Sequence, residues 1–224
     1  MGSKNKLKRF KENNTFENVF QPTREELVEG NFKPKGNWNK NIFNNDNPIV
    51  LELGCGKGEY TVGLARRYPN KNFIGIDIKG ARFWRGAKTA LEDNIPNAKF
   101  IRTQIELIDH VFTENEVNEI WITFPDPQIK YQRTKHRMTN LQFLERYKKV
   151  LNPNGIVHLK TDSEFMHGYT LGLLHGAGHE VQYANHNIYK QEGSPAEVTE
   201  IQTYYESQYL EQDKPITYIR FLIN

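Results

Sequence analysis

The chain has 224 residues and a net charge of +3, with 25% charged and 37% hydrophobic residues. This length fits one α/β domain, or one domain with an insertion, and allows a sizeable buried core. No apolar run approaches the length of a membrane span, and the N-terminus has lysines but no apolar segment of a signal peptide. We therefore expect a cytoplasmic protein without a membrane partner.

Cysteine and histidine give no support for cross-links or metals. Cys55 is the single cysteine, so no disulfide can form within the chain. His175 and His179 have helical spacing, but Gly176 and Gly178 weaken the helix that would present them. Neither a CxxC nor an HExxH pattern occurs. We therefore expect no metal site.

The first 40 residues are polar and lack a sustained period, apart from a short helical pattern near residues 23–27. Their beginning is basic and free of acidic residues, with Lys4, Lys6, Lys8, Arg9 and Lys11. This composition predicts a flexible basic arm over residues 1–40, followed by a single domain over 41–224. Residues 37–47 are rich in asparagine and are expected to form a loop.

From residue 48 onward, strand and helix patterns alternate. Strands are expected at residues 48–53, 72–77, 98–103, 119–124, 156–160, 181–189 and 216–223, and helices at 60–68, 83–91, 139–151, 163–173 and 196–210. Thr139 and Gln142 have the spacing of a capping box. The alternation predicts an α/β fold with a doubly wound, mainly parallel sheet. Residues 190–214 are too long for a hairpin and are expected to form a loop-helix insertion.

A glycine-rich turn, Glu-Leu-Gly-Cys-Gly-Lys-Gly at residues 52–58, joins the first of these strands to the first helix. Glycines permit positive φ and let a ligand approach the backbone, while the amides of the next helix point into the gap. In open α/β sheets, nucleotides bind at such turns. The spacing is Gly-x-Gly-x-Gly and not the Gly-x-Gly-x-x-Gly of dinucleotide sites. We therefore expect Gly54 and Gly56 to line a nucleotide-type site.

Two acidic residues beside the turn restrict the chemical class of ligand that can bind there. Glu52 enters the turn, where it would repel a phosphate and attract an ammonium or sulfonium group. Asp77 ends the second strand about 20 residues after the turn, the usual place of a ribose acceptor. A cationic, ribose-bearing ligand without phosphate points to S-adenosylmethionine. The alternative, an ordinary tight turn with a surface aspartate, leaves the combination of strand, helix and spaced acid unexplained.

A second motif, Phe-Pro-Asp-Pro at residues 124–127, follows the strand expected at 119–124. The prolines fix the backbone on both sides of Asp126. We expect this carboxylate at the carboxyl edge of the sheet, together with Glu52, Asp77, Gln104 and Asp162. A second basic cluster follows, and two such clusters on one chain favour a polyanionic partner; it consists of Lys130, Arg133, Lys135 and Arg137.

With these motifs, the chain from about residue 48 onward resembles the bacterial tRNA (guanine-N7)-methyltransferases. The resemblance rests on residues 51–58, on Phe-Pro-Asp-Pro, on Thr-Asp at 161–162 and on Thr-Tyr-Tyr-Glu at 203–206. Many class I methyltransferases share the first motif, whereas the last three, in this order, are more specific. The resemblance implies a seven-stranded class I fold whose last strand is antiparallel. It also implies methyl transfer from S-adenosylmethionine to N7 of guanine 46 in the variable loop of tRNA.

The resemblance also implies the site residues. The cofactor would be held by Glu52, Gly54, Gly56, Asp77, Gln104 and Asp126, and Asp126 would be catalytic. The tRNA guanine would be held by Lys130, Asp162, Thr203, Tyr204, Tyr205 and Glu206. The chain departs from the family pattern at Asp77, where many members have Glu, at Gln104, where they have Asp or Asn, and at Gln128-Ile129, which replaces Trp-His or Trp-Pro.

Other functions remain open on the residues alone. A small-molecule methyltransferase would share the cofactor half but would not need the basic clusters. An adenine amino-methyltransferase would show Asn/Asp-Pro-Pro-aromatic, and Asp126-Pro127-Gln128 lacks the second proline and the aromatic residue. A 5-methylpyrimidine enzyme needs a cysteine nucleophile, and Cys55 belongs to the glycine turn. An RNA-binding module without activity and both a monomeric and a homodimeric state stay open as well.

Overall fold

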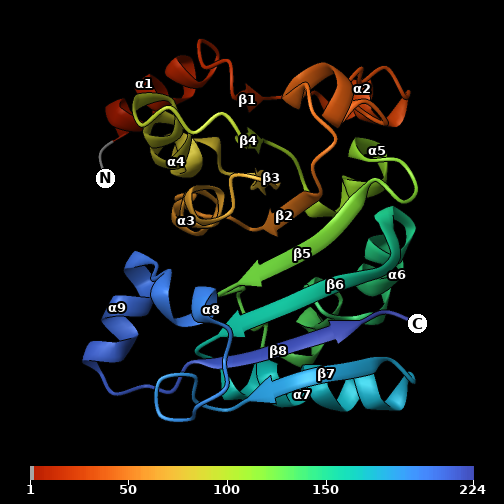
Figure 1. Ribbon diagram of the computed structural model, residues 1–224, viewed down its shortest axis with the longest axis vertical. Helices are drawn as coiled ribbons and strands as arrows, with labels where there is room; N and C mark the ends of the chain where they lie inside the picture. The colour runs from red at the N-terminus through yellow and green to blue at the C-terminus, as the bar shows by residue number, and fades with distance from the viewer. Residues whose placement is uncertain (1–2) are drawn as a thin grey trace.

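The computed structural model of the chain describes residues 3–224, with side chains from residue 5 on, and its sheet has eight strands in the order β1-β4-β3-β2-β5-β6-β8-β7 (Figure 1). Strands β1 to β6 pair in parallel, and β8 lies antiparallel between β6 and β7. The strands are β1 (Val19–Phe20), β2 (Ile49–Leu53), β3 (Asn72–Ile76), β4 (Ala98–Ile101), β5 (Val117–Thr123), β6 (Leu151–Thr161), β7 (Glu180–Asn185) and β8 (Thr217–Leu222).

The central strand β2 is buried along its whole length, as expected for a parallel strand covered on both faces. Its alternating side chains divide the core. Leu51 and Leu53 pack with residues of α5, α6 and α7, and Val50 packs with residues of α3, α4 and α8.

The helices are α1 (Ser3–Asn13), α2 (Arg24–Val28), the π-helix η1 (Trp38–Phe43), α3 (Glu59–Arg67), α4 (Gly80–Glu92), η2 (Ile105–Leu107), α5 (Ile108–Val111), η3 (Tyr131–His136), α6 (Leu141–Val150), α7 (Glu164–Gly176), α8 (Ala196–Glu200) and α9 (Tyr204–Glu211).

The order of the strands determines where a ligand can bind. Strand β2 lies between β3, which follows it in the chain, and β5, which belongs to the other half of the fold. The direction of winding therefore reverses beside β2, and in open α/β sheets ligands bind at the carboxyl ends of the strands at this switch point. The glycine turn after β2 and the Phe-Pro-Asp-Pro loop after β5 both lie there.

The predicted fold class is confirmed, including the antiparallel last strand, and the sheet has one strand more than predicted. The additional strand, β1, belongs to the segment for which we predicted a flexible arm. The described part of this segment is folded onto the domain: Asn13 Nδ2 donates to Gly80 O (2.9 Å), and Asn18 Nδ2 donates to Ala87 O (2.9 Å). Trp38 has no exposed surface. Residues 1–2 of the predicted arm lie outside the described residues.

Two helix boundaries also differ from the prediction. Helix α6 is capped by Asn140, whose side chain accepts from Phe143 N, whereas Thr139 Oγ1 bonds Thr170 Oγ1 (2.7 Å). The single helix predicted at 196–210 is two helices, α8 and α9. The break occurs because Thr203 and Glu206 form a capping box that begins α9.

The buried position of Trp38 predicts that the N-terminal segment contributes to stability. Its indole packs on Phe20, Phe32 and Phe112 and donates to Val111 O (3.2 Å). We expect Trp38→Ala to lower the free energy of unfolding by about 3–5 kcal/mol in urea denaturation. The control Val28→Ala, at a side chain that is 50% exposed, should change it by less than about 0.5 kcal/mol. Equal stability of Trp38→Ala and the parent would contradict this packing.

Candidate active site

The glycine turn crosses over the end of β3. Gly54, Gly56 and Gly58 have φ values of 74°, 57° and 76°, in the left-handed region. Gly54 N and Cys55 N both donate to Ile76 O, at 2.8 and 3.1 Å. The turn is therefore fixed to the neighbouring strand by backbone hydrogen bonds.

The three glycines differ in what lies in front of them. A Cβ at Gly56 would meet only Gly54 O, at 4.0 Å, and one at Gly54 would meet Met138 Sδ at 3.8 Å. A Cβ at Gly58 would lie 2.6 Å from the ring of Phe100. Gly58 is thus required for packing, whereas the turn around Gly54 and Gly56 is less crowded, since Cβ atoms there would make only ordinary van der Waals contacts. This is a cradle that a ligand can enter and that side chains would fill, so the turn fits the cofactor expected from the sequence.

Asp77, directly after β3, lies against the turn. Its Oδ2 accepts from Gly56 N (3.0 Å) and its Oδ1 accepts from Lys79 N (2.7 Å), and the residue is 9% exposed. The carboxylate therefore has a fixed orientation beside Gly56, and each oxygen keeps further capacity to accept a hydrogen bond.

Glu52 lies deeper and joins three elements. Its Oε2 accepts from Thr61 N (2.8 Å) and from Thr61 Oγ1, and its Oε1 accepts from Thr123 Oγ1 (2.6 Å). The residue is 3% exposed. Burial raises the pKa of Glu52 to about 7, although the hydrogen bonds from Thr123 and Thr61 oppose the shift. Glu52 therefore connects β2, α3 and β5, which are the frame of the site.

Asp126 is exposed in the loop that follows β5. Its Oδ1 accepts from Gln128 N (3.0 Å), which closes a tight turn over Pro127. Phe124 before it has a φ of 48°, and its amide donates to Lys160 O (2.8 Å). The loop is thus held by backbone geometry and presents the Asp126 carboxylate at the carboxyl edge of the sheet.

Gln104 lies three residues after the end of β4, and Asp162 directly follows β6. Gln104 is exposed and its Oε1 accepts from Arg24 at 3.5 Å. Asp162 is half-buried after β6, and burial raises its pKa while Lys214 opposes the shift. Asp162 and Gln104 therefore lie at the same edge as Glu52, Asp77 and Asp126, as the sequence predicted for the ends of parallel strands.

The first residues of α9 lie over the glycine turn. Tyr204 and Tyr205 are 51% and 44% exposed. Lys57 Nζ lies 3.7 Å from the centre of the Tyr204 ring, a cation–π contact, and Tyr204 N donates to Glu59 Oε2 (3.0 Å). The structure thus places two aromatic side chains beside the cofactor cradle.

Glu206 differs from its neighbours because it has no exposed surface. Its carboxylate accepts from Lys160 Nζ (2.7 Å to Oε1), from Tyr189 OH (2.8 Å) and from Thr203 N (3.2 Å). Thr203 is the N-cap of α9 and is bonded to Glu206. This placement does not support the direct guanine contact that we predicted for Glu206.

The basic cluster after Asp126 is divided. Lys130, Arg133 and Lys135 are exposed, on and beside the 3₁₀ helix η3. Arg137 is 6% exposed, donates to Gln128 O and Ile129 O (both 3.2 Å) and stacks on the Tyr169 ring at 4.4 Å. Arg137 therefore supports the Asp126 loop, and the other three cations face solvent.

Sequence reasoning missed several residues that shape the site. Thr61 and Thr123 fix Glu52, Met138 borders Gly54, and Lys160 is fully buried beneath α9. The threonines carry a weak signal, since Thr61 lies in the first turn of α3, after the glycine turn, and Thr123 ends β5, just before the Phe-Pro-Asp-Pro loop. Lys160 carries none, because a lysine beside Thr161-Asp162 is expected to be exposed.

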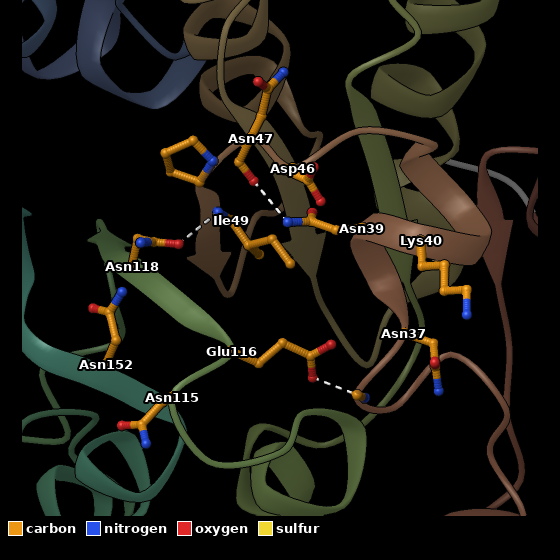
Figure 2. Close-up of a pocket in the computed structure, with 12 residues that line it drawn as sticks. Asn37, Asn39, Lys40, Asp46, Asn47, Ile49, Asn115, Glu116, Asn118 and Asn152 are labelled. Atoms are coloured by element: carbon orange, nitrogen blue, oxygen red, sulfur yellow. Dashed lines mark hydrogen bonds between the residues drawn. The ribbon is translucent and has the colours of Figure 1, made fainter.

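A separate cleft lies at the opposite edge of the sheet. Figure 2 shows its lining of amide side chains around Ile49, the first residue of β2. Asn118 Oδ1 accepts from Ile49 N (2.8 Å), and Glu116 accepts from Gly36 N (3.0 Å). None of the predicted site residues lines this cleft. Across residues 3–224, no cluster of three metal-ligating side chains occurs and no helix is long and apolar enough to cross a membrane.

Solved structures with this fold include the 16S rRNA methyltransferase KamB, with a TM-score of 0.62 and 14% identity over 83% of this chain and 92% of that one. An S-adenosylmethionine-dependent methyltransferase from Aquifex aeolicus has a TM-score of 0.56 and 15% identity over 98% of both chains. At these identities the likeness concerns the fold alone.

The sequence comparisons are more specific. The family model described as "Putative methyltransferase" matches residues 46–219. A tRNA (guanine-N(7)-)-methyltransferase of Christiangramia forsetii is 75% identical over 100% of both chains. One of Bacteroides fragilis is 48% identical over 98% of this chain and 86% of its own length. The chain belongs to the tRNA (guanine-N7)-methyltransferase family.

Proposed function

We propose that this protein methylates N7 of a guanine in tRNA, using S-adenosylmethionine, and that the target is guanine 46 of the variable loop. The observation that carries the proposal is the open cradle at Gly54 and Gly56 beside Asp77, in a chain that is 75% identical to a tRNA (guanine-N(7)-)-methyltransferase over its full length.

The residues around the cradle fit each part of this cofactor. When bound, S-adenosylmethionine supplies an electrophilic methyl group on a sulfonium. Asp77 would accept hydrogen bonds from the ribose hydroxyls, because its carboxylate is oriented beside Gly56 (3.0 Å). Gly54 and Gly56 would leave room for the amino-acid portion, and Gln104 would lie beside the adenine. Glu52 would act mainly by shaping the turn, because Thr61 and Thr123 occupy its carboxylate.

Guanine N7 has a lone pair and no proton at neutral pH, so its alkylation needs no general base. The protein has to align the base with the methyl group and exclude water, and such positioning can contribute roughly 7–11 kcal/mol. This requirement agrees with a site built of carboxylates, a glycine turn and aromatic rings. No nucleophilic cysteine is needed, and Cys55 is buried in the turn.

Carboxylates have a specific role in this reaction. Methylation places positive charge on the purine, which makes its N1–H and 2-amino groups stronger hydrogen-bond donors. Asp126 or Asp162 would accept from that edge, and the interaction would strengthen toward the transition state, as catalysis requires. Tyr204 and Tyr205, which are exposed beside the turn, would stack on the base. Lys130 would contact the adjoining RNA backbone.

The product identifies the reaction. Unmodified tRNA incubated with the protein and labelled S-adenosylmethionine should become cleavable by borohydride and aniline at one variable-loop guanine, position 46.

We expect Asp126→Asn to lower kcat about 100-fold and tRNA affinity less than about threefold, because the carboxylate acts in the transition state. The control Asp46→Asn lies at the opposite edge, in the amide-lined cleft. A methylated adenine or a 2′-O-methylated ribose would exclude the proposed function, and undiminished cleavage by Asp126→Asn would exclude the role of Asp126.

Cofactor affinity tests Asp77. We expect Asp77→Ala to weaken binding of S-adenosylhomocysteine by about 1.5–3 kcal/mol in titration calorimetry, the range for a hydrogen bond to a charged group. Asp93→Ala is the control, because Asp93 forms an exposed ion pair with Arg66. Circular dichroism should confirm that both variants are folded. Unchanged affinity of Asp77→Ala would remove Asp77 from the cofactor site.

The salt dependence of tRNA binding tests the exposed cations after Asp126. Neutralising Arg133 and Lys135 to Gln should flatten the slope of log K against log salt by roughly 1–2, because each phosphate contact releases counterions. A matched control neutralises Lys40 and Lys148, which are exposed at the opposite edge of the sheet. If both double variants changed the slope equally, the effect would reflect net charge and the cluster would not be a tRNA contact.

A further inference from the structure

A fully buried lysine lies beneath the candidate site. Lys160 is the penultimate residue of β6, and its side chain has no exposed surface. Its Nζ bonds Glu206 Oε1 and Oε2, at 2.7 and 2.8 Å, and donates to Ile201 O (3.1 Å). Burial lowers the pKa of Lys160 to about 8, while Glu206 opposes the shift. The Lys160 ammonium is paired directly with the Glu206 carboxylate.

The Lys160 ammonium also contacts two motifs of the site. It lies 5.0 Å from the ring centre of Tyr60, in the first turn of α3, and 5.7 Å from that of Phe124, where the Asp126 loop begins. Phe124 in turn packs on Tyr209 of α9, with ring centres 6.1 Å apart. One buried cation thus contacts the helix after the glycine turn, the start of the Asp126 loop and α9.

Glu206 completes the connection on the side of α9. Besides Lys160, its carboxylate accepts from Tyr189 OH (2.8 Å) and from Thr203 N (3.2 Å), and its own amide donates to Thr203 Oγ1 (3.2 Å). A buried ion pair is a weak source of stability, because desolvation offsets the attraction between the charges. It does fix geometry, since every other arrangement leaves a charge unpaired in the interior.

We propose that the Lys160–Glu206 ion pair is a positioning device that holds the beginning of α9, and with it Tyr204 and Tyr205, over the cofactor cradle. The exposed end of α9 already contacts the turn through Lys57 and Glu59. On its buried side, α9 is attached to β6 by the Lys160–Glu206 ion pair. On this account Glu206 does not touch the base, and its loss acts through the tyrosines.

The consequence for tRNA rests on the proposed function, in which these tyrosines stack on guanine. Disturbing the pair should then raise KM for tRNA more than it changes the affinity for cofactor, because the cradle is built by β2, β3 and the glycine turn. A direct guanine ligand at Glu206 would behave differently. Lys160→Met would then leave tRNA binding intact, since the Lys160 ammonium lies in the interior.

The test compares the full-length protein with Glu206→Gln, Lys160→Met and the double variant. Hydrogen exchange followed by mass spectrometry reports the protection of residues 203–211, and strands β2 and β5 serve as the internal reference. Steady-state kinetics give KM for tRNA, and calorimetry gives Kd for S-adenosylhomocysteine. Lys190→Met is the matched control, because it breaks an exposed ion pair, with Asp213, in the same segment.

Each single variant should speed exchange in α9 at least tenfold and raise KM for tRNA at least tenfold, with Kd for S-adenosylhomocysteine within threefold of the parent. The double variant leaves no charge unpaired, so its exchange should lie between the parent and the single variants, at least threefold above the parent. Lys190→Met should match the parent.

Unchanged α9 protection in Lys160→Met would overturn the proposal, and so would a normal tRNA KM in that variant beside a defective Glu206→Gln. The single variants could also lose protection in β2 and β5, which would indicate general destabilisation. The double variant is then the test, and parental protection of α9 in the double variant would contradict the proposal. Exchange is measured without tRNA, so a parent protein that failed to methylate guanine would overturn the proposed function and leave the positioning of α9 to be judged by exchange alone.

Discussion

The buried carboxylate of Glu52 is the constraint on which the candidate site depends. Glu52 is the penultimate residue of the central strand, and Thr61 and Thr123 both donate to its carboxylate. These bonds fix the start of α3 and the end of β5 relative to β2. The glycine turn and the Asp126 loop begin or end within a few residues of these bonds. The buried hydrogen bonds of Glu52 therefore fix the distance between the two loops. The backbone bonds from Gly54 and Cys55 to Ile76 then place the turn over β3.

A second buried charge organises the other side of the site. Lys160 pairs with Glu206 beneath α9 and contacts the rings of Tyr60 and Phe124. In the proposed function, the two tasks of a methyl transfer are divided between Glu52 and the Lys160–Glu206 pair. One shapes the cradle beside Asp77, and the other holds the aromatic residues that would receive the base. Both lie in the interior, which leaves the exposed groups at the edge free to contact ligands.

The sequence was sufficient to predict the fold and to bring the candidate site residues to one edge of the sheet. Asp77, Asp126 and Asp162 follow parallel strands, and the carboxyl ends of such strands meet at one edge. Burial of charged residues was not predictable in this way. Glu206 and Arg137 look like surface residues, and only their partners, Lys160 and the carbonyls of the Asp126 loop, account for their burial.

The N-terminal segment was missed for a related reason. Helix α1 has lysines and little apolar surface, so its pattern resembles that of a flexible arm. The described segment is held by apolar packing around Trp38 and by amide side chains, with Asn13 and Asn18 donating to carbonyls of α4. The composition of a segment does not predict such contacts between distant parts of the chain. The same segment adds β1 to the edge of the sheet beside β4.

The central claim is that the cofactor binds at the glycine turn and faces the Asp126 loop. A crystal structure of the full-length protein with S-adenosylhomocysteine tests it most directly. We expect the ribose hydroxyls within hydrogen-bonding distance of Asp77 and the amino-acid portion of the ligand against Gly54 and Gly56. The sulfur should be directed toward the loop that carries Asp126. A ligand found in the amide-lined cleft at the opposite edge, or at the turn with its ribose remote from Asp77, would contradict the account.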